Sequence, residues 1–225
     1  MNLKLLFKYT TRSRPDLFER GLLSIINNIS NRNYHLLVSV DIDDRSMDGM
    51  INVWRNTQNI TFIAGNSLNK IDAINRDINN FSYAWDVLIN MSDDMIFKVK
   101  GFDAYITQPF KNLETTEIKN LDKCLHYPDG NRNDLITMAI IGRTYYERFN
   151  YIYHSDYKSL YCDNEMTEHS KELGCYEYIP VQIFEHLHPA YSRHGAIFDQ
   201  QYSKTESYMA EDGITYQRRK ANGWK

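Results

Sequence analysis

Apolar runs and helical stripes alternate along residues 3–91. The runs are short and almost wholly apolar, as is typical of strands buried on both faces of a parallel sheet. They cover residues 3–9, 35–40, 60–64 and 85–91. Between them, apolar residues recur at helical spacing across residues 17–29, 47–54 and 71–78. This strand–helix order predicts an α/β fold with a mainly parallel central sheet and helices on both of its faces.

Single residues predict where two of the helices begin, and the second half of the chain shows a less regular pattern. Pro15 suits the first turn of the first helix, and Ser46 suits the N-cap of the second. Further along, the pattern predicts strands at 135–141 and 178–184, a helix at 163–173 closed by Gly174, and an irregular C-terminal region from about residue 186. Neither a repeat nor a linker interrupts the sequence, so we expect one domain over residues 1–225.

The composition narrows the function classes. Hydrophobic residues make up 42% and charged residues 24% of the 225 positions, as in an ordinary globular protein. The net charge of −3 argues against nucleic acid as a partner, because no basic surplus exists to neutralise phosphates. Three separated cysteines and the absence of any apolar stretch of about 18 residues favour a soluble, cytoplasmic protein without a transmembrane segment.

Polar clusters follow each of the first four predicted strands. These clusters are residues 10–14 (TTRSR), 41–44 (DIDD), 66–70 (NSLNK) and 92–94 (SDD). In open parallel sheets, ligands bind beyond the carboxyl ends of the strands. We therefore expect the four clusters to form one site.

Two of the candidate groups suit a metal ion. The adjacent carboxylates of Asp93 and Asp94 repel each other unless a cation or hydrogen-bond donors lie nearby, and a divalent ion held by a diphosphate supplies that charge. His186 and His188 point the same way if their segment is extended. Carboxylate plus imidazole favours Mn²⁺ over Ca²⁺ or Zn²⁺. The alternatives are a solvated turn for the Asp pair and one structural plus one exposed histidine.

The other candidates have plain structural alternatives. Asp43 and Asp44 can accept bonds from a nucleobase or ribose, or they can belong to a turn and a helix cap. Lys70 can reach a diphosphate or remain a solvated surface residue. Asp163 or Glu165 can serve as a general base, or can simply favour the N-terminal dipole of a helix.

Taken in order, these segments resemble glycosyltransferase family 2, the large inverting group with the GT-A fold. The first-strand ending Thr10–Pro15, the Asp43–Asp48 segment and Asn69-Lys70 with Ala73 and Asn75 are similar to its nucleotide-binding motifs. Ser92-Asp93-Asp94 resembles the DxD metal motif, and Asp163 before Gly174 resembles the ED motif that carries the base. His186 or His188 resembles the third metal-site group. Arg45, Ser92 and Cys162 depart from the family pattern, at the usual Gly, the first Asp of DxD and the Glu of ED.

The resemblance implies a metal-dependent inverting glycosyltransferase that moves a sugar from a nucleotide diphosphate, most commonly UDP, to a hydroxyl acceptor. Residues 1–95 are the nucleotide-binding half and 96–225 the acceptor and catalytic half. The implied donor-binding residues are Thr11, Arg12, Arg14, Asp43, Asp44, Lys70, Ser92 and Asp93. The implied ligands of Mn²⁺ or Mg²⁺ are Asp94, His186 and His188, and the implied base is Asp163, with Glu165 as the alternative. The acceptor is a glycan, a lipid-linked molecule or a small molecule.

Three rival functions use similar residues. A nucleotidyltransferase shares the fold and the acidic metal site but attacks phosphorus. A metal-dependent phosphohydrolase uses Asp and His clusters without needing a nucleoside-binding strand end. A non-catalytic nucleotide-sugar-binding relative keeps the fold and loses the base, which the presence of both Asp94 and Asp163 argues against.

Overall fold

The computed structural model describes residues 3–111, 120–191 and 198–225. A seven-stranded sheet with the order β3-β2-β1-β4-β7-β6-β8 forms its centre. The strands are β1 (Leu5–Thr10), β2 (Tyr34–Asp41), β3 (Ile60–Gly65), β4 (Val87–Met91), β6 (Cys124–His126), β7 (Ile140–Gly142) and β8 (Tyr176–Tyr178). The first four are mutually parallel, and β7 runs antiparallel to both β4 and β6. A second, two-stranded sheet pairs β5 (Met95–Phe97) with β9 (Phe184–His186).

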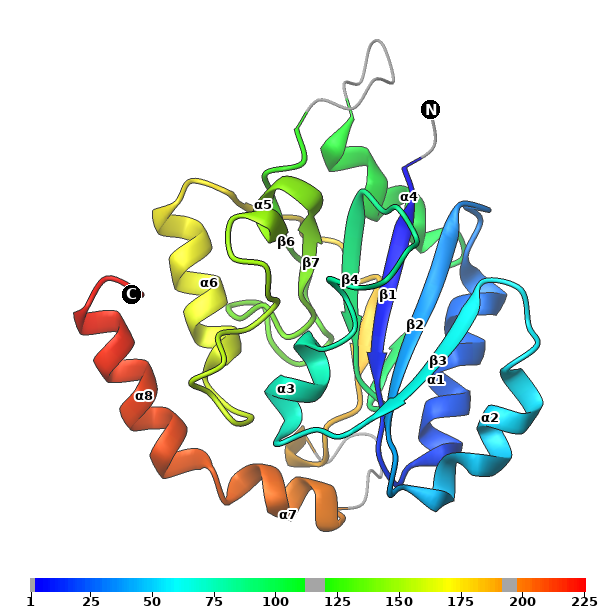
Figure 1. Cartoon of the computed structure of the whole chain (residues 1–225). Helices are drawn as coiled ribbons and strands as arrows, with labels where there is room; N and C mark the ends of the chain where they lie inside the picture. The colour runs from blue at the N-terminus through cyan, green and yellow to red at the C-terminus, as the bar shows by residue number, and fades with distance from the viewer. Residues whose placement is uncertain (1–2, 112–119, 192–197) are drawn as a thin grey trace.

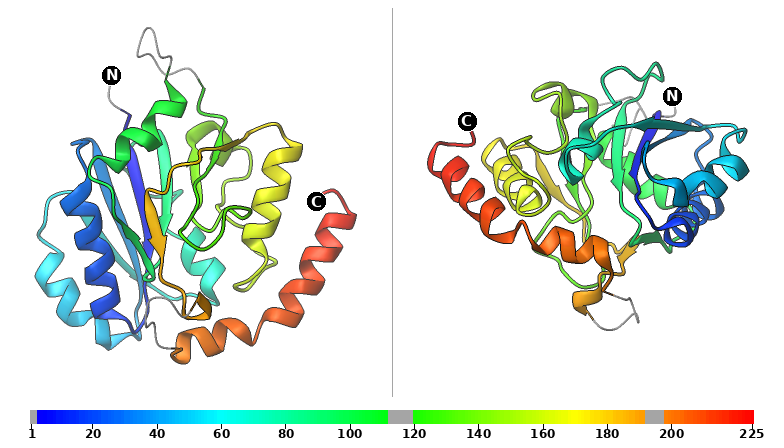
Figure 2. Two further views of the ribbon diagram at one scale, coloured as in Figure 1. Left: turned by 180° about the vertical axis from the view of Figure 1, so that it is seen from behind. Right: turned by 60° about the horizontal axis from the view of Figure 1, so that its bottom comes forward.

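Helices cover both faces of the central sheet (Figures 1 and 2). They are α1 (Pro15–Asn28), α2 (Asp48–Trp54), α3 (Lys70–Asn75), α4 (Phe102–Thr107), α5 (Arg143–Glu147), α6 (Cys162–Glu172), α7 (Gln200–Glu206) and α8 (Met209–Ala221). Short 3₁₀ turns η1 (Arg45–Met47), η2 (Gln108–Phe110) and η3 (Pro189–Tyr191) complete the described elements. The predicted α/β architecture with helices on both sides is confirmed.

Strand β1 explains why both faces are covered. Five of its six residues are buried, and successive side chains enter opposite cores. Phe7 joins the core that contains Phe18 of α1 and Phe102 of α4. Leu6 joins the core that contains Ile71 of α3 and Met166 of α6. An almost continuous apolar run therefore identified a central strand correctly.

Two strand predictions were wrong in extent. Of the expected strand at 135–141, only the end pairs as β7. Earlier in the segment, the N–H of Ile136 donates to Oγ1 of Thr167 at 3.0 Å rather than to a neighbouring strand. The expected strand at 178–184 is the gap between β8 and β9, which belong to different sheets. Pro180 lies in that gap and has no N–H to donate to a ladder.

The prediction of an irregular C-terminal region was also wrong. Residues 200–221 form α7 and α8, which run beneath the strand ends and then alongside α6 (Figure 1). The expected Ser46 cap differs too, since α2 begins at Asp48 and the carboxylate of Asp44 caps η1. In the described ranges, no helix is both long and apolar enough to span a membrane.

Candidate functional site

The carboxyl ends of the four parallel strands meet at one edge of the sheet (Figure 1). The strand register pairs Thr10 with Ser39, Asp41 with Gly65, and Tyr9 with Met91. The polar segments that follow these strands therefore start side by side, as predicted.

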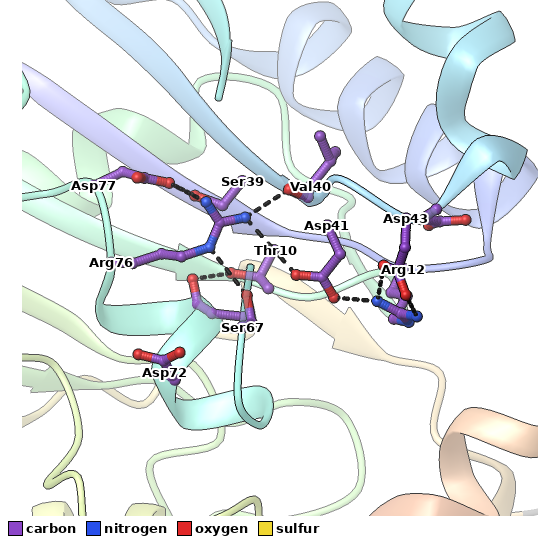
Figure 3. Close-up of polar contacts among 12 residues, drawn as sticks. Thr10, Arg12, Ser39, Val40, Asp41, Asp43, Ser67, Asp72, Arg76 and Asp77 are labelled. Atoms are coloured by element: carbon purple, nitrogen blue, oxygen red, sulfur yellow. Dashed lines mark hydrogen bonds and ion pairs between the residues drawn. The ribbon is translucent and has the colours of Figure 1, made fainter. Parts of the chain in front are cut away.

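Arg12 connects the ends of β1 and β2 (Figure 3). Its guanidinium donates two bonds to the carboxylate of Asp43, at 2.8 and 2.9 Å, and one to Asp41 at 2.5 Å. The bonds from Arg12 hold the pKa of Asp43 below its ordinary value. Behind them, Arg76 donates to the carbonyl of Val40 at 2.6 Å and to Asp77 at 2.9 Å. Oδ1 of Asp41 is buried and has no hydrogen-bond partner within the described residues.

Asp44 fastens the loop after β1 to the loop after β2. It is buried, and its carboxylate accepts the N–H of Ser13 at 2.7 Å and the hydroxyl of Ser46 at 2.6 Å. Ser13 has φ of 58°, in the left-handed region that is uncommon for a residue other than glycine. The carboxylate of Asp44 is therefore occupied by bonds within the two loops, whereas Asp43 and Asp41 lie beside Arg12 at the strand ends.

The pair after β4 is buried and its two carboxylates differ. Asp94 accepts bonds from Ser92 Oγ and from the Tyr202 hydroxyl, the latter at 2.9 Å. Nε2 of His186 lies 3.3 Å from its Oδ2. Burial alone would raise the pKa of Asp94, but His186, Lys70 and Ser92 together hold that pKa well below its ordinary value. Burial raises the pKa of Asp93 to about 8, with the Thr11 hydroxyl only partly opposing it, and Asp93 Oδ1 lacks a hydrogen-bond partner among the described residues.

His186 lies between two carboxylates, one of which the sequence analysis missed. Its Nδ1 is 3.3 Å from Oδ2 of Asp129, which is 1% exposed. The N–H groups of Asn131 and Arg132 donate to Oδ1 of Asp129 at 2.8 and 2.6 Å and fix it in place. Burial lowers the pKa of His186, but Asp94 and Asp129 together raise it to about 9. Asp129 precedes Gly130 in what reads from sequence as an ordinary turn, so no pattern distinguished it.

His188 is close to this group without joining it. Its ring centroid lies 5.6 Å from that of His186 and 4.9 Å from that of Tyr202. Burial lowers the pKa of His188. Over the described ranges, no three His, Cys, Asp or Glu side chains are already grouped as a metal site.

Helix α7 reaches the strand ends from the C-terminal part of the chain. Asp199 caps its N-terminus and accepts two bonds from Arg14, at 2.7 and 2.6 Å. The same guanidinium lies 4.1 Å from the centroid of the Tyr202 ring, whose hydroxyl bonds to Asp94. Arg14, predicted to bind the donor, is thus paired within the protein. Asp199 and Tyr202 were not foreseen, because they are remote in sequence.

The two candidate bases in α6 have different surroundings. Asp163 is half-buried and accepts the N–H of Asn164 at 2.9 Å. Burial raises the pKa of Asp163, although that bond and the charges of Lys70 and Arg132 act in the opposite direction. Lys70 itself is exposed at the start of α3, after the capping side chain of Asn69.

Glu165, in contrast, has no free oxygen. Arg219 donates to its two oxygens at 2.7 and 2.8 Å, and the Tyr157 hydroxyl donates to one of them at 2.8 Å. Glu165 is 6% exposed and Arg219 is 1% exposed. The pair joins α6 to α8.

Solved structures with the same arrangement were found, although no family model and no curated protein matches the chain. A mannosyltransferase from Pyrobaculum calidifontis, in complex with GDP-Man and Mn²⁺, superposes with a TM-score of 0.64 at 12% identity over 81% of this chain and 55% of its own. TarS from S. aureus, in complex with UDP, gives 0.59 at 11% identity over 81% and 60%. The fold is GT-A.

A third structure matches over nearly the full length of both chains. It is from Desulfovibrio desulfuricans and carries the description "putative nucleotide-diphospho-sugar transferase". It has a TM-score of 0.54 at 10% identity over 93% of this chain and 96% of that one. The mannosyltransferase and TarS structures are longer, and the chain spans only 55% and 60% of their lengths. At these identities, the GT-A likeness concerns the arrangement of the chain.

Proposed function

We propose that this protein is a glycosyltransferase that moves a sugar from a nucleotide diphosphate to a hydroxyl acceptor with inversion at the anomeric carbon. The observation that carries the proposal is the buried Asp93-Asp94 pair at the end of β4, with His186 against Asp94, in a GT-A fold. Two adjacent buried carboxylates and an imidazole suit a ligand that brings both a cation and phosphates. The Pyrobaculum mannosyltransferase was solved with GDP-Man, a nucleotide sugar, which agrees with this class.

The residues present fit a divalent ion. Asp94 and His186 are in contact, His188 is near them, and the orphaned Oδ1 of Asp93 faces no competing donor among the described residues. This mixed oxygen and nitrogen set suits Mn²⁺ or Mg²⁺. The Pyrobaculum mannosyltransferase was solved with Mn²⁺. Asp94, His186 and His188 would hold the ion, and its chemistry there is Lewis-acid stabilisation of the departing diphosphate.

The other predicted roles follow from position. Thr11 and Ser92 adjoin the carboxylate pair. Asp43, together with Asp41 in place of the predicted Asp44, accepts bonds from the nucleoside, for which UDP is our first choice. Lys70, which is exposed, provides positive charge toward the phosphates, whereas Arg12 and Arg14 contribute through the Asp43 and Asp199 carboxylates with which they are paired. Asp163 takes the proton from the acceptor hydroxyl. The acceptor oxygen attacks the anomeric carbon at the same time, and the nucleoside diphosphate leaves. Residues 1–95 then bind the donor, and 96–225 supply the base and the acceptor surface.

Calorimetry tests the donor class directly. We expect UDP-GlcNAc or GDP-mannose to bind in the presence of Mn²⁺ and to bind much more weakly in EDTA, because the divalent ion supplies the positive charge that neutralises the diphosphate. Equal affinity in the two conditions would remove the metal from the proposal. Incubation with the bound donor should then release the nucleoside diphosphate. Release of pyrophosphate or of a nucleoside monophosphate would point instead to attack at phosphorus, as in a nucleotidyltransferase.

The two carboxylates after β4 should contribute unequally to metal binding. Replacing Asp94 with Asn should weaken Mn²⁺ binding, measured by titration of the free protein, by more than the roughly 10- to 100-fold typical of outer-shell partners. Asp93→Asn should cost less, because Asp93 does not contact His186. An exposed carboxylate, Asp48, provides the control through Asp48→Asn. A larger loss for Asp93→Asn would move the ligand by one residue.

A further inference from the structure

Helix α8 holds the loop that leads into α6. The carboxylate of Asp212, which is 0% exposed, accepts three consecutive backbone N–H groups from that loop. The bonds run from Lys158 at 2.9 Å, Ser159 at 2.9 Å and Leu160 at 2.7 Å. Three charge-assisted bonds to one buried carboxylate leave the loop little freedom to move relative to α8.

A second anchor follows at the start of α6. Arg219, about two turns after Asp212 on α8, holds Glu165 through two bonds at 2.7 and 2.8 Å. Arg219 is also fixed at its other side, since it donates to the carbonyl of Trp224 at 2.9 Å. The guanidinium and carboxylate are both buried, so solvent does not compete for this pair.

Asp163 lies between the two anchors. It is three residues after Leu160 and two before Glu165, and Tyr161 between them has φ of 61°. A bulky residue in the left-handed region is strained and persists only where its surroundings fix it. Neither Asp212 nor Arg219 bonds to Asp163 itself, so any effect on Asp163 passes through the backbone.

We propose that Asp212 and Arg219 are positioning residues for the Asp163 base, and that α8 is part of the catalytic apparatus. The proposal rests on the function proposed above, in which Asp163 deprotonates the acceptor. A general base works only within hydrogen-bond reach of the proton that it removes, and a misplacement of about 1 Å can cost about 100-fold in rate. The buried charges of Asp212 and Arg219 thus hold the backbone on either side of Asp163 and thereby fix its position.

The test is the kinetics of the full chain carrying Asp212→Asn. Asn keeps the size of the side chain but presents an NH₂ group toward three N–H donors, so the loop should shift. We expect kcat for nucleoside diphosphate release from UDP-GlcNAc or GDP-mannose, with water as acceptor, to fall about 10- to 100-fold. Donor affinity should stay within about twofold, because Asp212 bonds to the loop backbone and, among the described residues, to none that is proposed to bind the donor.

The matched control is Glu211→Gln. Glu211 is the neighbour of Asp212 and also ties α8 to this loop, through an ion pair with Lys158, but its side chain is 58% exposed. We expect its kcat to remain that of the wild type. Arg219→Lys keeps the charge and loses the two-pronged bond, so it tests the second anchor and decides the proposal if Asp212→Asn does not fold.

The double variant separates positioning from general structural damage. If Asp212 acts through Asp163, adding Asp212→Asn to Asp163→Asn should lower kcat no further. Full additivity of the two losses, or a folded Asp212→Asn with wild-type kcat, would overturn the positioning role. Wild-type kcat in Asp163→Asn alone is a different result. It would reject Asp163 as the base of the proposed function, whatever the role of Asp212 and Arg219.

Discussion

Asp163→Asn should lower turnover by about 10² to 10⁴-fold while leaving donor affinity unchanged. A base acts on the acceptor, and Asp163 lies on α6, whereas the donor segments follow β1 to β4. Asn retains the size of Asp and can still accept the N–H of Asn164, so the start of α6 should persist. The measurement is nucleoside diphosphate release, with donor affinity taken from calorimetry.

The pH dependence gives a second signature of the same residue. Only the deprotonated carboxylate of Asp163 can accept a proton, so activity should fall as the pH is lowered through its pKa. Burial raises that pKa against the opposing charges of Lys70 and Arg132, so this acid limb should lie above the ordinary range of an aspartate. Asp93, with a pKa of about 8, titrates nearby, and comparison with Asp163→Asn removes its contribution. An unchanged acid limb in Asp163→Asn would contradict the assignment.

The arrangement of residues 3–95 could be predicted from sequence because its strands and helices show regular apolar patterns. Strands such as β1 are buried on both faces and read as apolar runs, and parallel strands must bring their carboxyl ends to one edge. The sequence therefore predicted that the segments with Arg12, Asp43 and Asp94 lie at one edge of the sheet. The individual partners were not, since the pairing of Arg12 with Asp43 depends on loop geometry.

The C-terminal helices escaped prediction because they bury charged side chains and tyrosines rather than an aliphatic stripe. Helix α8 buries Asp212, Tyr216 and Arg219, so it has no apolar stripe to announce a helix. Asp129 and Tyr202 reach His186 and Asp94 through contacts between segments far apart in the chain. Periodicity within a segment carries no information about such contacts.

Glu165→Gln should destabilise the protein by about 3–5 kcal/mol, because it leaves the guanidinium of Arg219 buried without a counter-ion. The cost appears as a lower midpoint of urea unfolding at unchanged m-value. Were Glu165 the base instead, the change would abolish turnover with little effect on the unfolding midpoint. The two roles that the sequence left open for Glu165 therefore give opposite patterns.

Glu168→Gln is the control for this measurement, since it breaks another ion pair between the same two helices. Glu168 lies 2.7 Å from Lys220, but these side chains are 36% and 48% exposed, and such surface pairs contribute about 0–1 kcal/mol. Equal destabilisation by the two variants would mean that the Glu165–Arg219 pair is not the buried link between α6 and α8. The double variant Glu165→Gln with Arg219→Met should recover part of the lost stability, because no unpaired charge then remains buried. That recovery would show that the lost stability comes from the unpaired charge of Arg219 rather than from the altered hydrogen bonds of residue 165.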